Sequence, residues 1–295
     1  MSRLAWASSC GHVQYMLPAS PRYSTGYAAA RNRPALLIET HSLKPFKVRA
    51  WAHYDVMVET LKAVGKSGPA LRQATTQADR EPPKAGSKLA VDYTAAKQGV
   101  PYTVRALETE TFTGVVTGAP VNRYLAKPRN LNVTLIRDSI PRTEVTVPKG
   151  YYVPRAWTTV IDLLRAHGIK LEPVKTPQTI DAETARFAKV SFPAQPFESR
   201  FLPSFETRWS KSKVTIQTGD YYVPVAQPLG KLAINLLDPE APDSVMKWGL
   251  MNAVFEMKEY AADYIFEPLA EKLFADNPKL KAEFDVALAA DKSLA

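Results

Sequence analysis

Two residues with catalytic potential, Glu39 and His41, lie two positions apart at the end of a short apolar run, Pro34 to Thr40. A short apolar run bounded by proline and a polar turn is typical of a buried strand. Residues two apart in a strand face the same side, so both side chains are expected to point into one crevice. Because an unpaired buried carboxylate is costly, Glu39 at this position suggests a chemical use.

The sequence carries no complete catalytic motif. None of the four histidines is followed by a carboxylate three residues later, so no local zinc-binding pair is present. The nucleophile motif GxSxG and the phosphate-binding loop GxxxxGK[ST] are both absent. The single cysteine, Cys10, excludes an internal disulfide framework.

The elements around Glu39 are those of an α/β layer. After Pro45, apolar residues recur at spacings of three and four, which predicts a helix that ends near Gly65. The positions that form this apolar face are Trp51, Tyr54, Val58 and Leu61. Upstream, Tyr23 and Tyr27 flank Gly26, where we expect a turn that returns the chain over the crevice. A strand followed by a helix indicates the last part of an α/β layer.

A change of composition predicts two domains. Residues 68–87 are rich in Gly, Pro, Ala, Lys and Gln, which favours a linker containing one possible helix, LRQATTQADR. Short β-prone segments then alternate with proline and glycine turns up to about residue 225. We therefore expect residues 1–67 to belong to one domain and 88–295 to a mixed α+β, β-rich accessory domain with C-terminal helices.

Two similar segments interrupt the β pattern. Residues 150–168 and 220–238 each contain Tyr-Tyr-Val-Pro followed by a helical apolar face, so we expect two equivalent strand-to-helix corners. We interpret the tyrosines and Trp157 as core residues. From Asp243 onward we expect helices, with Pro268 and Pro278 in first turns and with Trp248 and Phe255 on one packing stripe.

The composition argues against two classes of partner. The net charge of +9 would permit binding to polyanions, but Lys and Arg are scattered among carboxylates and no recognition motif accompanies them. We therefore expect no nucleic-acid partner. No apolar run approaches the roughly 18 to 20 residues of a membrane-spanning helix, so we expect no membrane span.

The order RYSTGYAAARNRPALLIETHSLKP, followed by a helix, resembles the last part of the catalytic domain of zinc carboxypeptidases related to carboxypeptidase A. It is most similar to a bacterial branch of that family with an extra C-terminal domain. The later stretch QPLGKLAINLLDPEAPDSVMKWGLMNAVFE looks like the tail of the same branch. The resemblance implies that residues 1–67 are the end of a mixed-sheet zinc carboxypeptidase domain.

The resemblance also implies roles for three residues. Glu39 would activate a zinc-bound water as general base and then carry the proton to the leaving amine. Tyr23, and after it Tyr27, would contact the substrate. The implied cofactor is zinc, and the implied substrates are peptides cut at their C-terminus, with cell-wall peptides as one class. A periplasmic or secreted location is implied for the full-length parent.

The sequence departs from the family in one major respect. The HxxE pair, the third zinc histidine and the Asn/Arg group that binds the substrate carboxylate have no counterpart here, and the context of His12 does not match. We therefore predict no metal ligand in this chain, and expect a C-terminal fragment that is inactive by itself. The alternatives are a non-catalytic binding or structural module and, for Glu39, a strand-end carboxylate satisfied by Lys44 or Arg33.

Overall fold

The computed structural model describes residues 13–15, 17–256 and 262–291. The chain divides into two compact units, residues 1–251 and 252–295. Within the described residues the protein is a mixed α/β structure with small sheets and six α-helices, and these sheets form no barrel. The expected mixture of helices and strands is therefore confirmed, whereas a carboxypeptidase arrangement stays a prediction.

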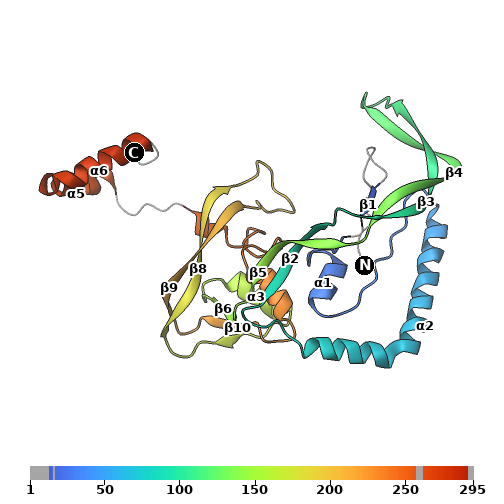
Figure 1. The fold of residues 1–295 in the computed structure, drawn as a ribbon, viewed down its shortest axis with the longest axis horizontal. Helices are drawn as coiled ribbons and strands as arrows, with labels where there is room; N and C mark the ends of the chain where they lie inside the picture. Colours follow the sequence, from blue (N-terminus) through green and yellow to red (C-terminus); the bar gives the residue numbers. More distant parts are fainter. Residues whose placement is uncertain (1–12, 16, 257–261, 292–295) are drawn as a thin grey trace. The chain divides into compact units, whose positions relative to one another are not determined.

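One long β-hairpin occupies residues 88–146 (Figure 1). Its base is the antiparallel pair β2 and β5, and its outer part is the antiparallel pair β3 and β4. The backbone N–H of Ala96 donates to the carbonyl of Asp138 at 2.9 Å and joins the two parts. A short strand, β1, runs parallel to the end of β4. The strands are β1 (Val13–Tyr15), β2 (Lys88–Ala95), β3 (Val100–Thr113), β4 (Pro120–Ile136) and β5 (Ser139–Thr146).

The two Tyr-Tyr-Val-Pro segments pair with each other. Strand β6 (Gly150–Val153) runs antiparallel to β10 (Tyr221–Pro224), with Tyr152 directly opposite Tyr222 and the ring centroids 5.0 Å apart. Helices α3 (Thr158–Ala166) and α4 (Gly230–Leu237) follow the two strands, and β7 (Glu172–Pro173) pairs with the other edge of β10. The prediction of two equivalent strand-to-helix corners is confirmed.

A second hairpin precedes the second corner. It consists of β8 (Gln178–Ser191) and β9 (Ser204–Ile216), which pair antiparallel over most of their length. Each corner thus follows a hairpin, and the expectation of a mainly β region from 88 to about 225 is confirmed.

The hydrophobic core of the first unit lies around the two corners. One buried cluster joins α1 (Ser24–Ala30), α3, α4 and the paired strands. The other lies beneath the base of the first hairpin. The main buried members are Ala30, Val153, Val160, Ile161, Leu164, Val223, Leu232, Ala233 and Val245 in the first cluster, and Val91, Val145, Val147, Val225 and Ile234 in the second.

The region before residue 80 differs from the sequence expectation. The run Pro34 to Thr40 lies within the described residues but forms no strand, because no other described segment pairs with it. Helix α1 (Ser24–Ala30) precedes it, and α2 (Phe46–Asp79) follows. The end predicted at Gly65 is wrong, since α2 continues past Gly65 and Pro69 and through most of the expected linker.

Helix α2 bends sharply along its length (Figure 1). Pro69 lies inside it, and proline removes one helical hydrogen bond and clashes with the preceding turn, which accounts for a bend. None of its 34 residues, all of which the structure describes, is buried.

The C-terminal expectations are met in part. Residues 263–290 form two helices, α5 (Asp263–Asp276) and α6 (Pro278–Ala290), and Pro278 occupies a first turn as predicted. Pro268 lies inside α5 instead. The packing stripe of Trp248 and Phe255 is wrong, since Trp248 lies in a turn and Phe255 in a short 3-10 helix, η1 (Asn252–Phe255). None of the described helices is both long and apolar enough to cross a membrane.

Candidate functional site

Glu39 lies in an irregular extended segment between α1 and α2, with its side chain exposed to solvent. His41 is also exposed. The Oγ1 atom of Thr40 lies 3.3 Å from the Nε2 atom of His53, and this contact joins the segment to α2. The crevice expected at a strand end is therefore not formed, because a crevice of that kind requires neighbouring strands.

The described residues do not fit a catalytic zinc ion. Such a site needs three protein ligands, and no group of three or more His, Cys, Asp or Glu side chains that could hold a metal occurs within the described residues. His12 lies outside the described residues. We derive no zinc-dependent step from the residues present.

Tyr23 immediately precedes α1 as its N-cap residue, and Tyr27 lies in the middle of this helix. The turn expected at Gly26 is wrong, because Gly26 is a buried residue inside this helix. A Cβ atom at Gly26 would lie 2.1 Å from the carbonyl oxygen of Ser20, so only glycine fits there. This close approach folds residues 19–23 back against the helix, and thereby fixes Tyr23 immediately before its first turn.

Tyr27 belongs to a hydrogen-bonded group that joins α1 to the end of α3. The Arg31 Nη1 group donates to the Tyr27 hydroxyl at 2.9 Å and to the His167 carbonyl at 2.8 Å. The Tyr27 hydroxyl lies 2.8 Å from His167 Nδ1. Since Arg31 can only donate, Tyr27 is free to donate its own proton to Nδ1, which places the imidazole proton on Nε2.

The charge state of His167 follows from the same surroundings. Burial lowers the pKa of His167 below its ordinary value, and the nearby guanidinium of Arg31 lowers it further. The neutral imidazole is thus favoured near neutral pH. A neutral ring with its proton on Nε2 can donate one hydrogen bond to a ligand.

A cavity of about 590 Å³ lies beside this group. Its wall is mainly apolar, with a few polar groups at the margin, which is the usual make-up of a small-molecule site. The apolar lining consists of Leu163, Leu232, Leu236, Val245 and Leu250, and the margin includes Arg22, Tyr27, His167, Asp243 and Trp248. The cavity suits a largely apolar group that carries a hydrogen-bond acceptor. Tyr27, predicted as a substrate contact, borders it.

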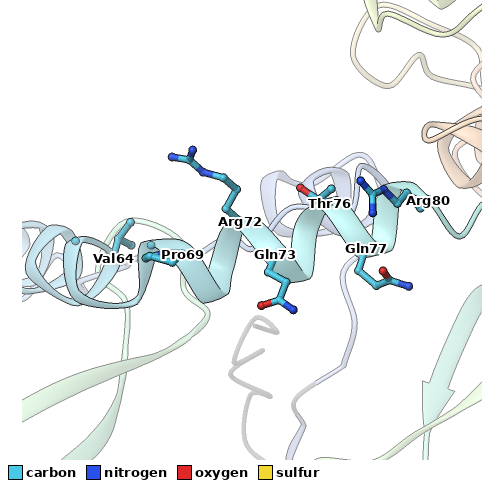
Figure 2. Close-up of a pocket in the computed structure, with 9 residues that line it drawn as sticks. Val64, Pro69, Arg72, Gln73, Thr76, Gln77 and Arg80 are labelled. Atoms are coloured by element: carbon cyan, nitrogen blue, oxygen red, sulfur yellow. The ribbon is translucent and has the colours of Figure 1, made fainter.

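A larger hollow, of about 760 Å³, lies along α2. Figure 2 shows that its labelled residues, which include Arg72, Gln73 and Arg80, project from one helix in several directions. The residues that line it, Val64 to Arg80, all come from α2, so the hollow has no opposing wall. A hollow lined by one helix alone is a poor ligand site.

Sequence reasoning missed His167 and Arg22 as members of a site. His167 stands just before Gly168, where the pattern indicated only the end of a helix. Its partners Tyr27 and Arg31 are separated from it by the entire first hairpin. No local spacing could have revealed such a contact.

The chain matches no family model, and no curated protein or solved structure shows significant similarity to it. The resemblance to zinc carboxypeptidases therefore rests on the motifs quoted above.

Proposed function

We propose that the chain is part of a zinc carboxypeptidase-like protein, in which Glu39 is the general base, and that it does not hydrolyse peptides by itself. One observation carries this proposal. The apolar run before Glu39 has the composition of a buried strand, yet it is uncovered: Leu36 is 44% exposed and Leu37 is 36% exposed.

The helix that follows also exposes large apolar side chains. Phe46, Trp51 and Leu61 of α2 are 77%, 56% and 71% exposed. Burying one large apolar side chain contributes about 1.5–3 kcal/mol, so exposed apolar side chains in two consecutive segments favour a covering layer. A sheet that paired with residues 34–40 and packed on α2 would supply that layer and would enclose Glu39.

The chemistry proposed for Glu39 is proton transfer during cleavage of a C-terminal peptide bond. Its carboxylate takes a proton from the attacking water as the new C–O bond forms. The same proton then passes to the amine nitrogen as the C–N bond breaks. General-base help of this kind contributes about 10²- to 10⁴-fold in rate, which is too little without the remaining groups of an active site.

The first experiment measures zinc content and hydrolysis of a blocked dipeptide with the purified chain. We expect less than one zinc per chain and no turnover that depends on Glu39. One bound zinc per chain together with turnover that Glu39→Gln abolishes would overturn the claim of inactivity.

The second experiment tests the role of Glu39 directly. The chain is joined behind a segment that carries an HxxE pair and a third histidine, and hydrolysis is measured again. Glu39→Gln should then lower kcat by about 10²- to 10⁴-fold, whereas the exposed control Glu59→Gln should not. Equal loss in both variants, or in neither, would contradict the proposal.

A second candidate function is a non-catalytic binding module, favoured by the cavity beside Tyr27 and His167. Here the probe is N-acetyl-leucine amide, which combines an apolar side chain with carbonyl acceptors. A saturable shift of the His167 ring resonances at millimolar concentrations, lost in the cavity-filling variant Leu236→Phe, would support binding. No shift in the wild-type chain would exclude this candidate.

A further inference from the structure

The guanidinium of Arg22 lies over two aromatic rings from distant parts of the first unit. Its Cζ atom is 4.8 Å from the ring centroid of Phe197 and 4.8 Å from that of Trp248. The two centroids are only 6.3 Å apart, and the ring planes are tilted by 47°. Arg22 therefore contacts both rings at once. Cation–π attraction from each ring acts on the same group.

Two carboxylates also contact Arg22. Glu198, next to Phe197, forms an ion pair with the guanidinium. Asp243 accepts a hydrogen bond from the backbone N–H of Arg22 at 2.8 Å and another from the indole Nε1 of Trp248 at 3.2 Å. One carboxylate thus holds both the segment that carries Arg22 and the ring on which its guanidinium lies.

The turn that supplies Phe197 and Glu198 has an unfavourable backbone conformation. Phe197 and Arg200 exchange two backbone hydrogen bonds, of 2.9 and 3.0 Å, around Glu198 and Ser199. These two residues have φ values of 48° and 64°. A two-residue turn with positive φ at both positions strongly prefers Asn and Gly. Glu and Ser are strained there, and such strain persists where surrounding contacts maintain it.

We infer that Phe197, Glu198 and Trp248 form a binding site for a guanidinium group, which Arg22 of the same chain occupies. We call these three residues the guanidinium cage. A flat guanidinium can lie on aromatic faces while its edge donates hydrogen bonds to a carboxylate, which an ammonium group cannot do equally well. The contact explains why the strained turn carries Glu198.

The cage also restrains the segment before α1. Arg22 immediately precedes Tyr23, so occupation of the cage fixes the backbone that carries this tyrosine. Only the meaning of this consequence for substrate binding rests on the proposed function, together with the substrate contact that the resemblance implies for Tyr23. The cage itself can be tested without any measurement of activity.

The test is chemical rescue of Arg22→Ala. The rescue is monitored through the indole N–H resonance of Trp248, which is assigned by its loss in Trp248→Phe. The substitution should move this resonance. Millimolar guanidinium chloride should return it toward the wild-type position in a saturable manner, whereas urea or sodium chloride at the same concentration should not. Equal responses to guanidinium and urea, or no response to either, would overturn the cage.

Three further variants keep the test decisive if Arg22→Ala folds poorly. In the otherwise wild-type chain, Phe197→Ala should move the Trp248 resonance, whereas Arg200→Lys, which alters the same turn outside the cage, should not. Ser199→Gly should relieve strain without removing a cage contact, so it should raise the midpoint of unfolding and leave the resonance in place. A Trp248 resonance that does not move in Phe197→Ala would contradict the inference.

Discussion

The hydroxyl of Tyr27 lies 2.8 Å from Nδ1 of His167 and joins α1 to the end of α3. The ring centroids of the two residues are 5.4 Å apart, so the side chains also pack against each other. This contact attaches α1 to the core around the Tyr-Tyr-Val-Pro corners.

Removing the Tyr27 hydroxyl should weaken that attachment. Tyr27→Phe leaves the Arg31 donor and the Nδ1 acceptor of His167 without this partner, so we expect a loss of about 1–3 kcal/mol in the free energy of unfolding. Urea denaturation followed by near-UV circular dichroism measures the loss. Tyr124→Phe, at a tyrosine that is 56% exposed, is the matched control and should change little. Equal effects of both changes would argue against a special role for Tyr27.

Protonation of His167 should destabilise the fold. Because burial and Arg31 lower its pKa, the unfolded chain binds this proton more readily than the folded chain. The contribution of His167 to the free energy of unfolding is therefore complete above its unfolded pKa of about 6.5. This contribution falls as the pH drops below that value. The ring resonances of His167 should titrate below the ordinary range. In His167→Gln, whose amide oxygen can still accept from Tyr27, the decline of stability between about pH 7 and pH 5 should be smaller.

Asp238 should not obscure that comparison. Burial raises its pKa, so its contribution has the opposite sign: stability is gained as the pH falls and lost as the pH rises through the folded pKa. This contribution is the same in the wild-type chain and in His167→Gln, and it cancels in their difference.

Two glycine substitutions should have opposite effects. A Cβ at Gly230 would lie 2.0 Å from the carbonyl oxygen of Val225, so Gly230→Ala should destabilise the first unit by at least about 1–3 kcal/mol. A Cβ at Gly65 meets nothing within 4 Å, so Gly65→Ala should stabilise α2 locally by about 0.5–1 kcal/mol. The urea midpoint measures the first effect, and slower amide exchange around residue 65 measures the second.

Core and surface leucines should respond differently to truncation. Leu164 is fully buried between the corners, and Leu164→Ala should cost about 2–5 kcal/mol. Leu61→Ala, at a residue that is 71% exposed, should change the free energy of unfolding by no more than about 0.5 kcal/mol. A large loss in Leu61→Ala would show that α2 is covered in solution, for example by another copy of the chain.

Local patterns in the sequence predicted the elements that depend on nearby residues. The repeated Tyr-Tyr-Val-Pro segments, the helix that ends at Gly168 and the β-rich middle of the chain follow from spacing and turn residues, and the structure confirms them. The prediction of a strand at Pro34 to Thr40 was wrong for a physical reason. An apolar run becomes a strand only when a neighbour pairs with its backbone, and no described segment does so.

The site depended on contacts that no local pattern contains. Arg22 meets Phe197 and Trp248 through the folding of two hairpins and two corners, and Tyr27 meets His167 in the same way. The role of Glu39 was inferred from its immediate neighbours in the sequence, and it stays a prediction. A surface built from distant segments requires the fold itself.

The pairing of β6 with β10 has a consequence for the order of folding. These strands are separated in sequence by α3 and the entire second hairpin, whereas each long hairpin pairs residues near its own turn. Closing a long chain segment is entropically costly and slow, so local pairs form early. During synthesis, the first hairpin can close long before Tyr222 is available to lie against Tyr152. The sheet of β6, β10 and β7 would then form last, and with it the core against which α1 packs.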